Sequence, residues 1–493
     1  MVECAGSCAC SPVLPGHKVR AMTQEIVLYE TVANSISGMI SAGTLRPGER
    51  VPSVRRLSNQ RRVSIATVLR AYEVLENRGL IEARPNAGYY VRHRSPPVGE
   101  PSISNPPAAP HLVGISALVQ KVLDSRRPGV VSFGAACPGP DHMPTAKLQR
   151  LISSIARRKP LSLTHYVLPP GNEELRRQIA RKSLDLGCNL AAADIIVTHG
   201  CMEALNLCVR AVAKPGDTIA LESPTYFGLL QILESMGVKA LEIPTHPREG
   251  ISLEALEFAL DRSRIAAVIA MPNAQNPLGF TMSDDNKKRL VKLLDKRGVP
   301  LIEDDVYGDL HYGDERPLPA KAFDRSGNVM LCSSFTKTVA PGFRLGWVAP
   351  GRWHANVQML KFINSVGCAE LLQLAIAEFL ANGGYDRQLR SLRRVFREQV
   401  SHVSAAVSEH FPSGTRITRP AGGFILWVEL PEGCNSEELF QQAIRNNISF
   451  GPGVLFSATD RYRNCIRMGC AEPWSPRIEQ AIIKLGGLAQ RQL

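Results

Sequence analysis

Apolar residues in the first part of the chain recur at helical spacing. The first predicted helix spans residues 24–43, and a second follows a Pro-Gly turn at residues 53–60. A third is predicted over residues 64–79, because Ser64 is a suitable N-cap and a glycine stands at the far end. The apolar face of the first helix consists of residues that stand four apart: Leu28, Val32, Ile36 and Ile40.

The third predicted helix has two different faces. The apolar face, which is predicted to pack inward, consists of Ile65, Val68, Tyr72 and Leu75. The opposite face, which is predicted to be exposed, carries Ala66, Thr67 and Arg70. The stretch LIEARPNAGYYV then alternates around a turn that ends at Gly88, which predicts a β-hairpin. Two helices joined by a tight turn and followed by a hairpin are typical of a winged helix-turn-helix.

Beyond residue 112 the pattern changes to short apolar runs that alternate with helical stretches. DIIVTHG precedes CMEALNLCVRAVA, DTIALESPTY precedes FGLLQILESMG, and IAAVIAMPN, VPLIEDDVY and VMLCSSF are further strand-like runs. This alternation predicts an α/β fold with a mainly parallel sheet and helices on both faces. Such sheets bind ligands at the carboxyl ends of their strands.

Composition suggests where these regions meet. Residues 95–112 are rich in proline and are predicted to form an extended linker. The winged helix-turn-helix is therefore predicted over residues 23–94 and the α/β domain over residues 113–493. Residues 1–22 are predicted to be a disordered tail, and because Met22 directly precedes the first helix we expect the start codon there rather than at Met1.

The cysteine spacing and the hydropathy of the chain argue against a metal-binding, membrane-spanning or secreted protein. The 12 cysteines include no CxxC pair, and no histidines cluster at zinc spacing, so no metal site is predicted. A metal or lipid site in the tail stays open as an alternative, because three cysteines crowd the first ten residues. No apolar run is long enough for a membrane span or a secretory signal, so a cytoplasmic protein with reduced thiols is predicted.

The positive charge of the chain is densest near its start. The formal net charge is +13, and residues 23–94 hold eleven arginines, no lysine and six acidic residues, a net charge of +5. A basic winged helix-turn-helix is suited to double-stranded DNA, although a basic module for protein contacts is the alternative. The predicted DNA-binding residues are Arg55 and Arg56 for phosphates, Thr67 and Arg70 for base edges or nearby phosphates, and Ser64 and Gly88 beside them.

The segment from Gly43 to Val91 resembles the DNA-binding domain of the GntR family of bacterial transcription regulators. The resemblance rests on GTLRPGERVPSVRRLSNQRRVSIATVLRAYEVLENRGLIEARPNAGYYV. That family often has arginine where this chain has Ile65, so one DNA contact expected from the family is absent. The operator sequence is therefore left open.

The stretch CSSFTKTVAPGFRLGW places Lys337 among small hydroxyl residues, ahead of a Pro-Gly turn and an arginine. A lysine in this setting can form a Schiff base with pyridoxal 5'-phosphate. The cofactor also needs a carboxylate at its pyridine nitrogen, donors to its ring hydroxyl, an aromatic face, and donors to its phosphate. The candidates are Asp304 for the nitrogen, Tyr307 and Asn276 for the hydroxyl, Tyr226 for the ring face, and Ser334, Arg344 and the backbone of Gly200, Cys201 and Met202 for the phosphate.

Taken singly, each of these residues has an ordinary alternative role in a turn, a cap, the core or the solvated surface. Their order along one alternating sheet favours the cofactor site. From residue 115 to 493 the chain resembles fold-type I pyridoxal-phosphate aminotransferases, in YVLPPGNEELRRQIA, VTHGCMEALNL, ESPTYFG, NPLGF, EDDVYGDL, SSFTKTVAPGFRLGW, PAGGFILWVEL and IRMG. The resemblance implies a smaller C-terminal α+β subdomain, Lys337 as the Schiff-base lysine, and Asp304 as the partner of the pyridine nitrogen. It also implies that Tyr166 reaches the phosphate of the neighbouring subunit's site and that Arg467 binds a substrate α-carboxylate, with a core-edge arginine as the alternative.

A GntR-type domain joined by a proline-rich linker to an aminotransferase-like domain resembles the MocR subfamily of regulators end to end. The resemblance implies a transcription regulator that binds pyridoxal phosphate, with or without an amino acid or amine effector, and forms a homodimer, head to tail. A working aminotransferase with an accessory DNA-binding domain is the alternative, because every required site residue is present. A domain that only dimerises is hard to reconcile with the joint presence of Lys337, Asp304, Asn276 and Arg467.

Overall fold

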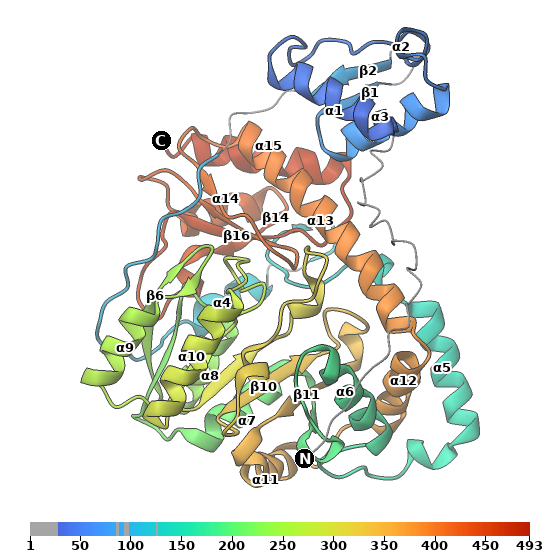
Figure 1. Cartoon of the computed structure of the whole chain (residues 1–493). Coiled ribbons are helices and arrows are strands. Elements are labelled where there is room, and N and C mark those ends of the chain that lie inside the picture. The colour runs from blue at the N-terminus through green and yellow to red at the C-terminus, as the bar shows by residue number, and fades with distance from the viewer. Residues whose placement is uncertain (1–27, 85–87, 93–97, 125–126) are drawn as a thin grey trace, which may run out of the picture. The chain divides into compact units, whose positions relative to one another are not determined.

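The computed structural model describes residues 28–84, 88–92, 98–124 and 127–493, and the chain divides between Ser95 and Pro96 into two units (Figure 1). The predicted tail, residues 1–22, and the turn residues 85–87 of the predicted hairpin lie outside the described residues. Among the described helices, none combines the length and the apolar character needed to cross a bilayer.

The N-terminal unit, called the reader below, contains three helices and one hairpin. Its elements are α1 (Leu28–Ser41), α2 (Val54–Arg61), α3 (Ile65–Asn77), β1 (Ile81–Arg84) and β2 (Gly88–Val91). Ser53 and Ser64 cap α2 and α3, because their side chains accept the backbone N–H of Arg56 and Thr67. The two strands pair antiparallel, from Ile81 opposite Val91 to Arg84 opposite Gly88. The predicted winged helix-turn-helix is therefore confirmed.

The core of the reader differs from the predicted faces at two helix starts. Val68, Tyr72 and Leu75 on α3 are fully buried, as predicted, but Ile65 is 49% exposed. Leu28, predicted on the apolar face of α1, is 57% exposed. Both are the first residues of their helices, and helical side chains tilt toward the N-terminus. These two side chains therefore project past the helix end, and the prediction that they pack inward was wrong.

The large unit is built on an eight-stranded sheet with the order β4-β11-β10-β9-β8-β5-β6-β7. The strand β11 runs antiparallel to both neighbours and β7 antiparallel to β6, while the other pairs are parallel. All six residues of β5 are buried, as expected of a parallel strand covered on both faces. The strands are β4 (Ile196–Thr198), β5 (Thr218–Ser223), β6 (Lys239–His246), β7 (Gly250–Ile251), β8 (Ala267–Ala270), β9 (Leu301–Asp304), β10 (Val329–Ser334) and β11 (Gly346–Ala349).

Helices cover this sheet, and a smaller subdomain follows it in the chain (Figure 1). The helices before the subdomain are α4 (Ser116–Asp124), α5 (Thr145–Arg158), α6 (Glu173–Asp185), α7 (Gly200–Val212), α8 (Phe227–Met236), α9 (Leu253–Arg262), α10 (Asp284–Arg297), α11 (His354–Ser365) and α12 (Glu370–Ala381). The subdomain has the antiparallel sheet β12-β13-β16-β15 and a parallel pair of β14 with β3. Its elements are α13 (Gly384–His410), β12 (Arg416–Ile417), β13 (Ile425–Glu429), α14 (Ser436–Arg445), β14 (Ile448–Ser449), β15 (Gly451–Pro452), β16 (Cys465–Gly469) and α15 (Pro476–Gln490), and β3 is Val131–Ser132. The predicted α/β fold with a smaller α+β part is confirmed.

The described part of the predicted linker, residues 98–112, lies along the large unit. The Ser104 hydroxyl accepts the Thr245 N–H at 2.8 Å. His111 and Ala240 exchange two backbone hydrogen bonds of 2.9 and 2.8 Å. Two prolines of the segment are buried, Pro101 and Pro106. The segment therefore lacks helix, as its proline content predicts, and it is anchored to β6.

Candidate functional site

A cavity of about 170 Å³ lies at the carboxyl ends of the central strands. Asp304 ends β9, Ser334 ends β10, and Tyr226 follows β5, so residues far apart in the sequence meet at one edge of the sheet. Of the predicted cofactor residues, all but Gly200 and Tyr166 line this cavity.

Asp304 presents a buried carboxylate to the cavity. Its side chain is 2% exposed, and its Oδ1 accepts the Val306 N–H at 3.1 Å and the Cys201 thiol at 3.4 Å. Burial raises the pKa of Asp304 to about 6. A carboxylate held in this way is suited to accept a hydrogen bond from a protonated pyridine nitrogen, whose positive charge would offset the cost of burial.

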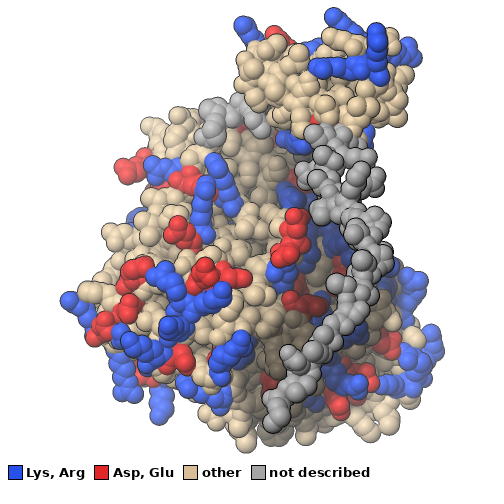
Figure 2. Space-filling model, in the orientation of Figure 1, with Lys and Arg blue, Asp and Glu red and all other residues tan. Residues whose placement is uncertain are grey.

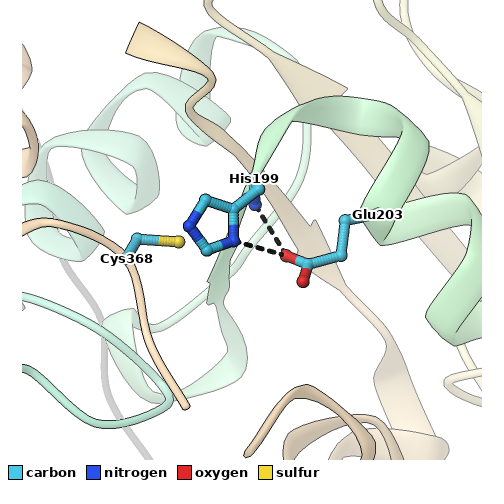
Figure 3. Close-up of side chains that lie close together, drawn as sticks. All are labelled: His199, Glu203 and Cys368. Atoms are coloured by element: carbon cyan, nitrogen blue, oxygen red, sulfur yellow. Dashed lines mark hydrogen bonds and ion pairs between the residues drawn. The ribbon is translucent and has the colours of Figure 1, made fainter. Parts of the chain in front are cut away.

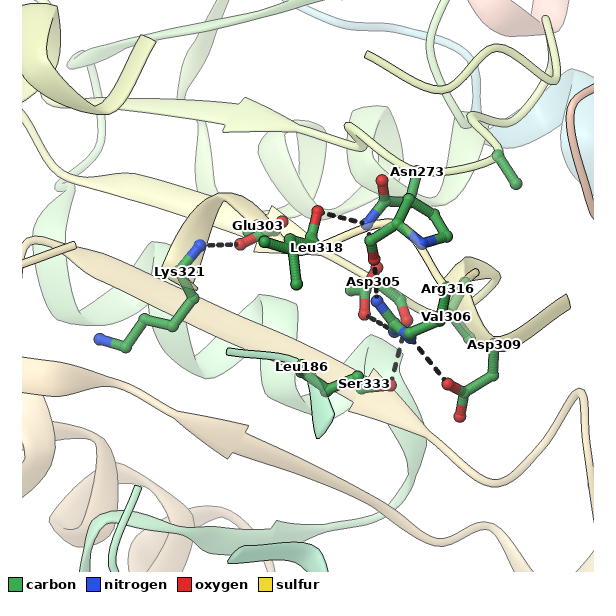
Figure 4. A network of polar contacts seen from close by, with 12 residues as sticks. Leu186, Asn273, Glu303, Asp305, Val306, Asp309, Arg316, Leu318, Lys321 and Ser333 are labelled. Carbon is green, nitrogen blue, oxygen red and sulfur yellow. Dashed lines mark hydrogen bonds and ion pairs between the residues drawn. The ribbon is translucent and has the colours of Figure 1, made fainter. Parts of the chain in front are cut away.

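The acids on either side of Asp304 do not line the cavity, as the two-residue period of a strand predicts, and Figure 4 shows Glu303 and Asp305 with their partners. Asp305 accepts a hydrogen bond of 2.9 Å from the Asn273 amide and forms an ion pair with Arg316. Glu303 accepts two backbone N–H groups, at 2.6 and 2.8 Å. Three consecutive acids therefore have three separate surroundings, and only the middle one lines the cavity.

Lys337 follows β10 in the chain and lines the same cavity as Asp304. Its Nζ donates to the Ala136 carbonyl oxygen at 2.5 Å, and burial lowers the pKa of Lys337 to about 8. Compared with an ordinary lysine, a much larger fraction is therefore the neutral amine at neutral pH, which is the form that attacks a carbonyl carbon. The contact with Ala136 was not predicted, because 201 residues separate the two positions.

The two groups proposed for the cofactor's ring hydroxyl are buried, and one of them has an unmatched polar atom. Asn276 is 3% exposed, and its carboxamide oxygen has no hydrogen-bond partner within the described part of the chain. Tyr307 is 2% exposed, and burial raises its pKa, so the phenol stays protonated and can donate. A buried amide with an unmatched oxygen on a cavity wall is expected where a ligand completes the hydrogen bonding. The residues present therefore fit pyridoxal phosphate, and we call this space the cofactor cavity.

The phosphate end of the cofactor cavity is formed by Arg344 and the start of α7. Gly200 has φ +76°, which favours glycine, and a Cβ there would lie 2.9 Å from Arg344 Nη2 and would push the guanidinium aside. The first backbone N–H groups of a helix, with the positive end of its dipole, favour an anion. Thr336, which was not predicted, accepts hydrogen bonds from Ser334 Oγ at 2.6 Å and from Arg344 Nη1 at 3.5 Å.

Arg467 lies on β16 beside a second cavity of about 440 Å³. The side chain is 1% exposed, its Nη2 donates to the Gly134 carbonyl at 2.5 Å, and its guanidinium carbon is 5.2 Å from the centre of the Phe456 ring. This cavity shares Tyr226, Lys337 and other walls with the first, so a molecule bound there would contact both sites. We call it the effector cavity.

Two predicted residues show features that the sequence did not indicate. Cys201 was predicted to bind the phosphate through its backbone, and its thiol donates to Asp304. Tyr166 is 83% exposed and lines neither cavity of its own chain. The role predicted for Tyr166 needs a second subunit, and it stays a prediction.

A separate polar cluster joins His199, Glu203 and Cys368, whose donor atoms lie within 4.8 Å of one another (Figure 3). We predicted no metal site. Lys361 Nζ donates to Glu203 Oε2 at 2.7 Å and lies 3.0 Å from His199 Nδ1. A lysine ammonium is therefore already the cation of this cluster, and a metal ion would have to displace it.

In the reader, Arg55 and Arg56 are exposed on α2, and Figure 2 shows basic side chains on the visible face of this unit. Arg70 is exposed too, but it forms an ion pair of 2.6 Å with Glu73 and also lies over the Tyr29 ring. The side chain of Arg70 is therefore partly engaged within the reader, which the sequence pattern did not indicate.

The other predicted DNA-binding positions have defined local roles. The Ser64 hydroxyl accepts the Thr67 N–H at 3.1 Å as the N-cap of α3 and lies 2.8 Å from the Thr67 hydroxyl. Gly88 begins β2 with φ +95°, and a Cβ there would lie 3.1 Å from Arg50 Nη2. Their contacts with DNA stay predictions.

The fold and the two cavities define a pyridoxal-phosphate protein of the aminotransferase type that carries a winged helix-turn-helix in the same chain. Residues 140–485 match the family "Aminotransferase class I and II", and residues 28–91 match "Bacterial regulatory proteins, gntR family". The chain therefore belongs to the class I and II aminotransferase family, and its GntR domain gives it the MocR-type architecture.

The chain is similar both to transcription regulators and to aminotransferases. The HTH-type transcriptional regulator YjiR of Escherichia coli K12 is 39% identical over 94% of this chain and 99% of its own. The 2-aminoadipate transaminase of Thermus thermophilus is 30% identical over 73% of this chain and 90% of its own. Among solved structures, the α-aminoadipate aminotransferase LysN of Thermus thermophilus, complexed with N-(5'-phosphopyridoxyl)-L-leucine, has a TM-score of 0.71 at 28% identity, and covers 76% of this chain and 94% of its own.

Proposed function

We propose that this protein is a DNA-binding transcription regulator whose affinity for its operator changes when its aminotransferase-like domain binds pyridoxal phosphate, with or without an amino acid or amine effector. The observation that carries the proposal is the cofactor cavity, where Lys337, Asp304 and Asn276 meet in a chain that also has a reader. A domain used only for dimerisation has no need of these three buried polar groups together.

Each group in the cavity has a defined task toward the cofactor. When bound, pyridoxal phosphate supplies an electrophilic carbonyl for amines and a protonated ring that withdraws electrons. Lys337 provides the neutral amine, because its lowered pKa favours that form. Asp304 holds the proton at the ring nitrogen, and Arg344 with the start of α7 binds the phosphate. Arg467 is positioned to bind the α-carboxylate of an amino acid beside Lys337.

Binding at this site can regulate DNA affinity only if two arrangements of the protein bind the ligand unequally. An amino acid bound at this site would place its amine beside Lys337 and its α-carboxylate at Arg467, whereas without an amino acid Lys337 would be the only amine at the cofactor. We propose that this change alters the dimer and so the separation of its two readers.

The dimer is proposed to be head to tail, and the exposed Tyr166 supports a site shared between subunits. Mixing subunits with Tyr166→Phe and subunits with Lys337→Ala tests this arrangement. A mixed dimer has one complete site if Tyr166 acts on the partner subunit, so cofactor affinity should return in part. If mixing restores nothing, Tyr166 does not act across the interface.

Catalytic transamination is the second candidate function, because the lowered pKa of Lys337 and the adjacent Arg467 are also what an aminotransferase needs. Gel-shift titration of the purified protein against the DNA upstream of its own gene, with and without pyridoxal phosphate, separates the two. Cofactor-dependent binding supports the regulator. Absence of specific DNA binding, together with steady turnover of an amino acid against a keto acid, would support the enzyme instead.

A further inference from the structure

The walls of the effector cavity differ in character from those of the cofactor cavity. The effector cavity is lined by apolar side chains from three parts of the large unit, together with the polar side chains of Ser132, Gln231 and Ser449. The apolar ones are Val119, Val122 and Leu123 of α4, Phe227 of α8, and Leu455. Val119 and Val122 are 1% and 8% exposed and form the dry part of this wall, whereas Leu123 is 42% exposed. The cavity of about 440 Å³ has room for a side chain beyond the atoms held at Lys337 and Arg467.

Each charged group that the structure describes in this cavity has an assigned task. Among the described residues that line it, the charged ones are Lys337, Arg344 and Arg467, and none is acidic. Lys337 and Arg344 belong to the cofactor, and Arg467 is positioned for the α-carboxylate. A second carboxylate or a second ammonium on the effector would therefore meet no free group of opposite charge among the described lining residues.

We propose that the effector is an α-amino acid with an uncharged and mainly apolar side chain of about the size of leucine or methionine. This inference rests on the proposed function, because it assigns the ligand class of the same site. The α-carboxylate binds Arg467, the α-amine reaches the cofactor beside Lys337, and the side chain packs against α4. Gln231, Ser132 and Ser449 also line the cavity and can form hydrogen bonds with an uncharged heteroatom of the side chain.

The cost of removing water from the effector's side chain is expected to decide which amino acids bind. Burial of an ionised side chain without a partner is costly, while each buried methylene group contributes favourably. Apolar pockets discriminate weakly among similar apolar side chains but strongly against unpaired charge. Leucine and methionine are thus expected to bind similarly, and glutamate and lysine at least about tenfold more weakly. A simple amine lacks the carboxylate that Arg467 is positioned to bind, and it is expected to bind more weakly than leucine.

The test is isothermal titration calorimetry of the full-length, cofactor-loaded protein with leucine, methionine, glutamate, lysine and isopentylamine. A Gln231→Lys variant places a cation in the cavity wall and should raise the affinity for glutamate relative to leucine by about tenfold. Ser235→Lys is the matched control, because Ser235 is exposed on the same helix and does not line the cavity. It should leave the glutamate-to-leucine ratio unchanged.

The possible outcomes separate this inference from the proposed function, because calorimetry needs no DNA. Tighter binding of leucine and methionine than of the charged amino acids, with a shift in Gln231→Lys alone, supports the inference. Equal or tighter binding of glutamate or lysine, or no heat from any amino acid, overturns it, even where pyridoxal phosphate still changes DNA affinity. Selective binding of leucine without any change in DNA affinity would support the ligand class and overturn the regulator.

Discussion

The reader and the cofactor cavity use charged residues in opposite ways. In the reader, Arg55 and Arg56 are exposed, and a phosphate backbone would be bound by the sum of many such charges. In the large unit, Asp304 and Arg467 are 2% and 1% exposed, and each has one position and one expected ligand group. Loss of one exposed arginine should therefore weaken DNA binding only partly, whereas loss of one buried group should remove its contact with the ligand entirely.

The largest effect is expected at Lys337. Lys337→Ala removes the amine that bonds to the cofactor, so the visible absorption band of the bound cofactor should be lost entirely and DNA affinity should no longer respond to pyridoxal phosphate. Absorption spectra and gel shifts measure both. Lys288→Ala is the control, because Lys288 is an exposed lysine of the same unit, on α10. Regulation that survives in Lys337→Ala would favour the domain as a dimerisation scaffold.

Substitutions of the neighbouring acids Asp304 and Asp305 should have different effects: one on cofactor binding and the other on the stability of the fold. Asp304→Asn should weaken cofactor binding by about ten- to a hundredfold, because a charge-assisted hydrogen bond is lost. Asp305→Asn breaks a buried ion pair with Arg316 and should lower the free energy of unfolding by about 3–5 kcal/mol. Equilibrium dialysis and urea unfolding give the two quantities. Equal behaviour of the two variants would mean that Asp304 is not distinguished from its neighbour.

The raised pKa of Asp304 predicts a pH dependence in the cofactor-free protein. Its folded pKa of about 6 lies above the ordinary value of 3.8, so between these values the folded state binds more protons than the unfolded state. Stability from this group is therefore present at pH 4 and lost as the pH rises to about 6, by on the order of 1–3 kcal/mol. The difference in unfolding free energy between wild type and Asp304→Asn, measured at both pH values, should change by that amount. A difference that is constant with pH would show that Asp304 is not buried as a carboxylate.

The smallest effect per residue is expected in the reader. Arg55→Ala combined with Arg56→Ala should reduce the slope of log affinity against log salt concentration by about 2 and weaken DNA binding by about tenfold, without effect on cofactor binding. Fluorescence anisotropy over a range of salt concentrations measures the slope. Arg289→Ala removes an exposed charge of the large unit and should leave it unchanged. An unaltered slope in the double variant would place the phosphate contacts elsewhere.

Sequence patterns predicted the two domains and the members of the cofactor cavity, because local signals mark them. In the reader, each helix cap and the hairpin are encoded by residues that lie close together in the sequence. In the large unit, the polar motifs stand at strand ends, and the two-residue period of a strand distinguishes Asp304 from its neighbours. Contacts between distant segments had no such signal. The Arg467 contact with Gly134 joins residues 333 positions apart, and the Cys201 thiol contacts Asp304, which lies 103 residues further along the chain. The exposure of Ile65 was missed, because helical periodicity takes no account of a helix end.

The central claim is that cofactor binding and DNA binding are coupled, and the most direct test measures that coupling from the cofactor side. The affinity of the cofactor-free protein for pyridoxal phosphate is determined by absorbance titration with and without saturating operator DNA. Because coupling is reciprocal, operator DNA should change the cofactor affinity by the same factor by which the cofactor changes the DNA affinity. Equal cofactor affinities in the presence and absence of operator DNA would contradict the account.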